Sequence, residues 1–171
     1  METHRYCIPI LDETGPTLNL TTGQEEIMFI YSVKFVCGVQ NLPATPVPVC
    51  TPVRQGIYST EINIHNFQPQ KEAVIEKRAM VLIHNDAPDG REPKFVKAKP
   101  FEQITLPPDS ATMDDCCGLA DKLQFNAAHL NIGFLEIVST VELNVTAVYT
   151  ATDLKSASIS IEVESISGRK V

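Results

Sequence analysis

The chain has 171 residues, enough for one domain with a sizeable core and too few for two ordinary ones. Its hydrophobic share of 43% and charged share of 20% are typical of globular rather than disordered proteins. The net charge of −7 disfavours nucleic acids and anionic membrane surfaces as partners, and no apolar run approaches the ~20 residues of a membrane-spanning helix, so we expect neither nucleic-acid binding nor membrane insertion.

The first 26 residues have weak hydrophobic patterning, which predicts an extended N-terminal arm (1–26) followed by a single domain (27–171). The arm has no basic segment followed by an apolar one, so we expect no signal peptide and a cytoplasmic location. An arm of this kind is ordered only when something holds it in place, and a partner subunit is the candidate that we favour.

Period-two alternation begins at 27–37 and puts five large apolar residues on one face: Ile27, Phe29, Tyr31, Val33 and Phe35. The opposite face is largely apolar too, which predicts a strand buried on both sides. The link 38–56 that follows contains four prolines, at positions 43, 46, 48 and 52. Proline at that density favours extended backbone that lies over a surface.

The segments 56–66 and 72–83 are the next predicted strands, and the short polar link with Pro69 between them favours an antiparallel hairpin. The segment 85–92, "NDAPDGRE", superficially resembles a calcium loop. An EF-hand needs an oxygen ligand at the third position, where this chain has Ala87. We therefore predict a tight turn there.

Three short strands bounded by prolines are predicted next, at 94–98, 101–106 and 110–114. The only segment with helical character is 114–124, where Asp114 or Asp115 is available as the N-cap. Gly118 inside this segment costs about 1 kcal/mol relative to Ala, so we expect a short helix.

The last predicted strands are 132–140 and 142–152, joined as a hairpin around Thr140 and Val141, and then 156–166. About seven to nine short strands at this spacing predict an all-β fold, an antiparallel, immunoglobulin-like β-sandwich. A set of strands closed on itself is the alternative.

Cysteine is the residue type with the most chemical options, and the chain has an odd number, five: Cys7, Cys37, Cys50, Cys116 and Cys117. In a chain that can build its own core this predicts reduced thiols rather than a disulfide scaffold. Adjacent cysteines are poor metal ligands because they point in different directions. A helix start activates thiols, however, so Cys116 and Cys117 are the candidates for a reactive thiol.

A Cys/His metal site has four candidate ligands, Cys37, Cys50, His65 and His84. Strand-end histidines without a fixed partner spacing are more often solvated, so we predict no metal and no cofactor. The candidates for a small-ligand site are Asn63, His65 and Tyr149. No G-x-S-x-G motif or oriented histidine is present, so we predict no catalytic residues and no enzyme activity.

The segments "TEINIHN", "LPPDSATMDD", "GFLEIVS" and "LNVTAVYTA", within residues 56–166, follow one another in an order of strands and turns that resembles the sensory rhodopsin transducer family. The resemblance implies a transducer-like cytosolic sandwich that assembles into an oligomer, with no catalytic residues to carry over. The N-terminal 55 residues have no counterpart in that family. The chain is also similar to small proteins of spore-forming bacteria, which implies a role at a bacterial cell or spore surface.

Three functional hypotheses from different classes follow. The first is a non-enzymatic interaction module that forms a homo-oligomer through sheet edges and the N-terminal arm (1–26). The second is a small-ligand-binding or signalling module of the transducer type. The third is a metal or thiol-redox protein that uses the cysteines.

Overall fold

The computed structural model describes residues 27–41 and 51–171, so the predicted arm (1–26) and the middle of the predicted link lie outside the described residues. The described chain forms ten strands and one helix: β1 (Phe29–Gln40), β2 (Gly56–Asn66), β3 (Ala73–His84), β4 (Ala87–Pro88), β5 (Lys99–Leu106), β6 (Ser110–Asp115), α1 (Cys116–Leu123), β7 (Asn131–Ser139), β8 (Asn144–Thr152), β9 (Ile159–Ile166) and β10 (Arg169–Lys170). All the strand pairs are antiparallel. The predicted all-β, antiparallel fold with one short helix is confirmed, whereas the finer immunoglobulin-like or transducer-like sandwich stays a prediction.

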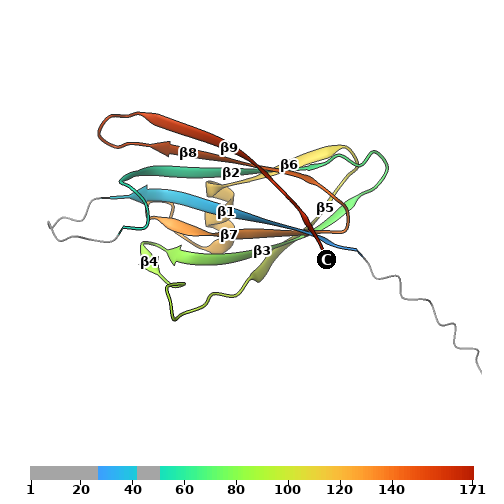
Figure 1. Cartoon of the computed structure of the whole chain (residues 1–171), viewed down its shortest axis with the longest axis horizontal. Helices are drawn as coiled ribbons and strands as arrows, with labels where there is room; N and C mark the ends of the chain where they lie inside the picture. Colours follow the sequence, from blue (N-terminus) through green and yellow to red (C-terminus); the bar gives the residue numbers. More distant parts are fainter. Residues whose placement is uncertain (1–26, 42–50) are drawn as a thin grey trace, which may run out of the picture.

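The strands pair in two groups that are joined through β1 (Figure 1). One group contains β3, β4, β5, β7 and β10, and β1 pairs with β7 from Phe29 to Cys37. The other group contains β2, β6, β8 and β9, and only the last three residues of β1, Gly38–Gln40, pair with it. The order of the strands has two ends, β4 and β9, so the sheet does not close on itself.

Gly38 lies where β1 passes from one group to the other. Its φ is 99°, in the region that favours glycine, and a Cβ at this position would lie 1.9 Å from the carbonyl oxygen of His129. The transfer of β1 between the groups therefore requires glycine at this position.

The core takes side chains from both groups of strands, because alternate residues of each strand point the same way. Fully buried members come from β1, β2, β3, β7, β8 and α1: Val33, Phe35, Ile62, Ile64, Ile75, Leu135, Ile137, Val145 and Leu119. The prediction that 27–37 is buried on both sides is wrong, since Ser32 and Lys34 on its other face are exposed. Only one face of β1 therefore contributes side chains to the core.

The predicted hairpin of 56–66 with 72–83 is wrong. β2 pairs with β1, β6 and β8, whereas β3 pairs with β4, β5 and β7, so the intervening chain crosses between the two groups. The buried side chain of Asn66 holds this crossing, because its amide nitrogen lies 2.8 Å from the carbonyl oxygen of Lys71 and 3.0 Å from that of Pro107. A buried amide with such partners fixes the path of the backbone.

The predicted hairpin around Thr140 and Val141 is wrong for the same reason: β7 pairs with β1 and β3, and β8 pairs with β2 and β9. The buried hydroxyl of Tyr31 fixes this second crossing. It donates a hydrogen bond to the carbonyl oxygen of Leu143 at 3.0 Å and accepts one from the amide of Leu143 at 2.6 Å.

The remaining local predictions are mixed. The helix is short, as predicted, and Asp115 is its N-cap, accepting a hydrogen bond from the amide of Gly118 at 2.7 Å. The turn at 88–90 is confirmed by the amides of Asp89 and Gly90, which both bond to the carbonyl oxygen of Leu82. The strand predicted at 94–98 is absent, and this segment runs irregularly into β5. Within the described part of the chain, no helix is long and apolar enough to cross a membrane.

Candidate functional site

Strand β9 forms one edge of the fold and presents an apolar row to solvent. It pairs with β8 over eight consecutive residue pairs and has no strand on its other side among the described residues (Figure 1). Ile159, Ile161 and Val163 are 65%, 66% and 65% exposed. An exposed apolar row on an unpaired strand is a feature of interaction sites.

The alternation of β9 is inverted relative to the core. Glu164 pairs with the buried Ala147 and therefore lies on the core side of the sheet, whereas Ile161 pairs with Thr150 on the outer side. The partly buried hydroxyl of Tyr149 on β8 donates a hydrogen bond to Glu164 at 3.2 Å. Glu162 and Glu164 thus lie on the inner side of the sheet. The apolar residues of β9 lie on the outer side, where no described segment covers them.

The contact of Tyr149 with Glu164 predicts a pH dependence of the free energy of unfolding. Burial, with the nearby charges of Glu164 and Glu162, raises the pKa of Tyr149 from 10.0 to about 12. Since the unfolded chain releases this proton at lower pH than the folded chain, the contribution of Tyr149 to stability is fully present below pH 10 and is lost as the pH rises from about 10 to about 12. We expect the difference in unfolding free energy between wild type and Tyr149→Phe to shift above pH 10 against the wild type, measured by urea unfolding at pH 8 and 11. A difference that stays constant between these pH values would contradict the assignment.

The edge strands β5 and β6 carry features that discourage pairing with another strand. β5 contains Lys99 and Pro100, and its register with β3 shifts between Lys77 and Arg78. β6 has only six residues and runs directly into α1. β9 has eight residues without Pro or Lys, and its register with β8 is unbroken. It is therefore the edge best suited to accept another strand.

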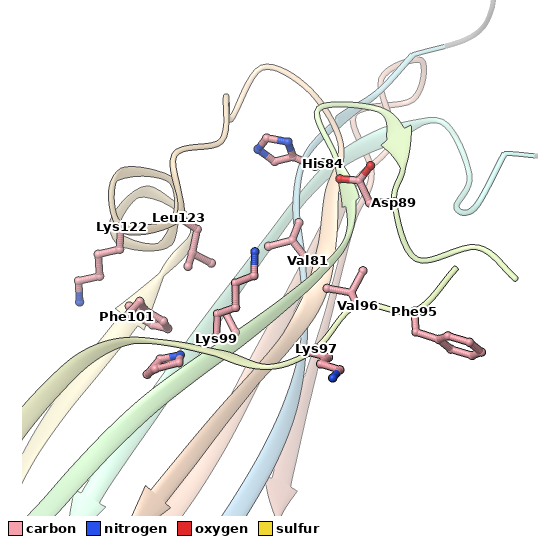
Figure 2. Close-up of a pocket in the computed structure, with 12 residues that line it drawn as sticks. Val81, His84, Asp89, Phe95, Val96, Lys97, Lys99, Phe101, Lys122 and Leu123 are labelled. Atoms are coloured by element: carbon pink, nitrogen blue, oxygen red, sulfur yellow. The ribbon is translucent and has the colours of Figure 1, made fainter. Parts of the chain in front are cut away.

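A second feature is a cavity of about 750 Å³ at the opposite side of the strand order, between β3, β5, the segment that precedes β5, and α1 (Figure 2). Its apolar lining consists of Ala79, Val81, Phe95, Val96, Pro100, Phe101 and Leu123. Its charged or titratable lining consists of Lys97, Lys99, Lys122, His84 and Asp89. The size is that of a small-molecule site, and the basic groups outnumber the acidic one.

A cluster of four charges lies beside this cavity. Lys77 is 2% exposed, and its ammonium nitrogen lies 2.8 Å from an oxygen of Asp114 and 2.8 Å from an oxygen of Glu102. Lys122 on α1 contacts the same two carboxylates, at 3.3 and 2.8 Å. The Lys77–Asp114 contact is an ion pair by distance rather than an aligned hydrogen bond. Two cations and two anions therefore balance one another between β3, β5, β6 and α1.

The carboxyl of Glu102 and the amine of Lys122 are perturbed in opposite directions. Burial alone would raise the pKa of Glu102, but hydrogen bonds from Lys122 and Lys77 outweigh burial and lower it. Burial alone would lower the pKa of Lys122, but Glu102 and Asp114 outweigh burial and raise it. Both shifts favour the charged forms of Glu102 and Lys122.

The cysteine predictions need correction. Cys37 on β1 and Cys116 at the start of α1 form a disulfide, with a sequence separation of 79. The prediction that these cysteines are reduced is wrong, and Cys116 is not available as a reactive thiol. Cys117 is free and exposed, so it remains the candidate thiol. Cys7 and Cys50 lie outside the described residues.

The candidate metal ligands do not meet in one site. The sulfur of Cys37 is in the disulfide, and Cys50 lies outside the described residues. His65 lies 3.7 Å from Asp109, whereas His84 contacts the carbonyl oxygen of Gln124 beside the end of α1. Among residues 27–41 and 51–171 no group of three or more His, Cys, Asp or Glu side chains is arranged to hold a metal ion.

The candidate ligand residues are also separated. Asn63 and His65 alternate with the buried Ile62 and Ile64, so they lie on the outer side of β2. Tyr149 pairs with the buried Thr60 and lies on the core side. The sheet therefore separates Tyr149 from Asn63 and His65. The basic cavity was not foreseen, because its lining comes from segments whose packing the sequence does not reveal.

Comparison of the chain with protein-family models, with curated proteins and with solved structures finds no match.

Proposed function

We propose that this protein is a non-enzymatic assembly module whose copies join through β9 into a homo-oligomer. The observation that carries the proposal is the outward row of Ile159, Ile161 and Val163, each about two-thirds exposed, on an edge strand that pairs only with β8 among the described residues. Covering such side chains contributes roughly 25 cal/mol per Å² of apolar surface removed from water. Pairing of the edge would satisfy its outward backbone groups in the same contact.

The charges of β9 select a register for a second copy. With a two-fold axis at Ile161, Ile161 faces its own counterpart, and Ile159 faces Val163 of the second copy. Glu162 then faces Ser160 of the second copy, so no like charges lie directly opposite. Moving the axis to Glu162 would oppose two glutamates, which is unfavourable. A second copy is therefore an acceptable neighbour for this strand, and cyclic dimers are the commonest oligomers.

The disulfide indicates the kind of compartment in which the protein works. Disulfides persist in oxidising surroundings and are rare in the reducing cytosol. The Cys37–Cys116 disulfide therefore favours an oxidising location, such as a cell or spore surface, over the cytosol. The arm (1–26), which we proposed as a second contact between copies, lies outside the described residues.

The test is the mass of the full-length protein in solution. Ile161→Lys places a charge in the centre of the β9 contact, and we expect it to shift the protein from oligomer to monomer in sedimentation equilibrium, by at least about tenfold in the dissociation constant. Met113→Lys is the matched control, because Met113 is 54% exposed on β6, the other edge strand of the same group. It should leave the mass of the oligomer unchanged.

Two outcomes would overturn the proposal. One is a wild-type protein that stays monomeric throughout the concentration range. The other is an oligomer that survives Ile161→Lys as well as it survives Met113→Lys. Circular dichroism of both variants checks that the strands remain folded.

A further inference from the structure

The cavity over β3 and β5 combines apolar walls with basic groups. Val81 on β3, Phe101 on β5 and Leu123 at the end of α1 line it from three elements. Part of the wall therefore comes from packed elements, and the rest comes from the irregular segment that precedes β5. A volume of about 750 Å³ lies within the range of sites that hold small molecules.

The basic groups of the cavity differ in how they are engaged. Lys122 is held by Glu102 and Asp114. Lys99 has no carboxylate within ion-pair distance among the described residues, and Figure 2 shows its side chain extending toward Val81 and His84. Lys97 and Phe95 point away from this side of the cavity (Figure 2). Lys99 is thus the cation that remains available to a ligand, with His84 on the same side.

Lys99 is an available cation in a chain whose net charge is −7. Because Lys122 is balanced by Glu102 and Asp114, the available charges of the lining on this side are Lys99 and the one carboxylate, Asp89, with His84 beside Lys99. An unpaired ammonium at the rim of an apolar cavity favours an anion whose remaining body is apolar. A phosphorylated ligand is less suited, because the lining contains no arginine and no glycine-rich loop to hold a phosphate group.

We propose that this cavity binds an amphipathic organic carboxylate, with the carboxylate at Lys99 and the apolar body against Val81, Val96, Phe101 and Leu123. The site lies at the far end of the strand order from β9. Ligand binding and assembly are therefore separate properties, and each can fail without the other.

The experiment uses decanoate as the probe and isothermal titration calorimetry of the full-length protein as the measurement. We expect saturable binding of decanoate with one site per chain. Decylamine, which has the same tail and the opposite charge, should bind at least about tenfold more weakly, because its ammonium would face Lys99. Equal binding of the two probes would overturn the proposal, since it would show that only the tail is recognised.

Variants locate the site. Lys99→Glu should weaken decanoate binding by about tenfold or more, while the exposed position of Lys99 leaves the fold intact. Lys155→Glu is the matched control, because it makes the same change in net charge at an exposed lysine in the turn between β8 and β9. The proposal is overturned if decanoate does not bind, or if both variants weaken binding equally. Lys99→Glu should leave the mass of the oligomer unchanged, which separates this site from β9.

Discussion

Replacing the Cys37–Cys116 disulfide by Cys37→Ala with Cys116→Ala is expected to lower the free energy of unfolding by about 4 kcal/mol. The disulfide closes a loop with a sequence separation of 79. A cross-link over a loop of this length removes much of the conformational entropy of the unfolded chain, worth roughly 3 to 4.7 kcal/mol for loops between 15 and 100 residues. Both sulfurs also lie in the core cluster, so the variant loses packing as well.

The neighbouring cysteine gives the control. Cys117 is exposed and free, so Cys117→Ala should change the free energy of unfolding by less than about 0.5 kcal/mol. Chemical unfolding monitored by circular dichroism, with and without dithiothreitol, measures both effects. If reductant lowers the stability of wild type but not of the double variant, the loss belongs to this bond. If the wild type has the same free energy of unfolding after refolding with dithiothreitol as without it, the proposed role of the disulfide is contradicted.

Lys77→Ala is expected to cost about 3 to 5 kcal/mol, because it removes the buried partner of Asp114 and leaves Lys122 as the one cation paired with Asp114 and Glu102 among the described residues. Asp114 is 1% exposed, so its charge cannot be compensated by water. Arg78→Ala is the control, because Arg78 is the next residue of β3 and pairs with Glu76 where both are over a third exposed. That pair should contribute less than about 1 kcal/mol.

A double variant separates charge from packing. Lys77→Met with Asp114→Leu removes one charge of each sign, and it should recover most of the stability lost in Lys77→Ala, because apolar replacements for a buried ion pair are often neutral or better. Urea unfolding at pH 7 measures all of these variants. If Lys77→Ala costs no more than Arg78→Ala, the cluster does not contribute as we describe.

Acid should weaken the same cluster. The pKa of Glu102 is lowered in the folded state by Lys122 and Lys77, against the opposing effect of burial. The resulting stability is therefore present above the unfolded pKa of 4.5 and is lost as the pH falls through the lower folded pKa. We therefore expect the free energy of unfolding to fall in acid, because protonation of Glu102 removes its attraction to Lys122 and Lys77.

Most of the long strands of this fold were predictable from the sequence, but their partners were not. Alternation marks β2 and β8 because each has one buried face, which is a local property. Both predicted hairpins failed because consecutive strands cross between the two groups. Those crossings depend on buried contacts such as Asn66 with Lys71 and Tyr31 with Leu143, and no local pattern encodes them.

The charged cluster did leave a signal in the sequence. Lys77 is in phase with Ala73, Ile75 and Ala79, the buried residues of β3, so a lysine there needed a buried counter-ion. Asp114, considered only as a helix cap, is that counter-ion, whereas Asp115 is the cap. The disulfide left no comparable signal, because its two cysteines lie 79 residues apart and meet only through the folded core.

The outward row of β9 was hidden for a different reason. Its alternation was visible in 156–166, but alternation does not say which face meets the core. Ile159, Ile161 and Val163 would ordinarily be assigned to the buried side. The pairing of Glu164 with Ala147 shows instead that the glutamates occupy that side.

The measurement that tests the assembly through β9 most directly is oxidative cross-linking of Ile161→Cys, in a protein whose Cys7, Cys50 and Cys117 are replaced by serine. With a two-fold axis at Ile161, the two introduced thiols face each other, so we predict a disulfide-linked dimer on a non-reducing gel. Ser160→Cys in the same background is the control, since Ser160 faces Glu162 of the second copy and its thiols are offset. A protein that stays monomeric with Ile161→Cys, or that cross-links equally from both positions, would contradict the proposed contact.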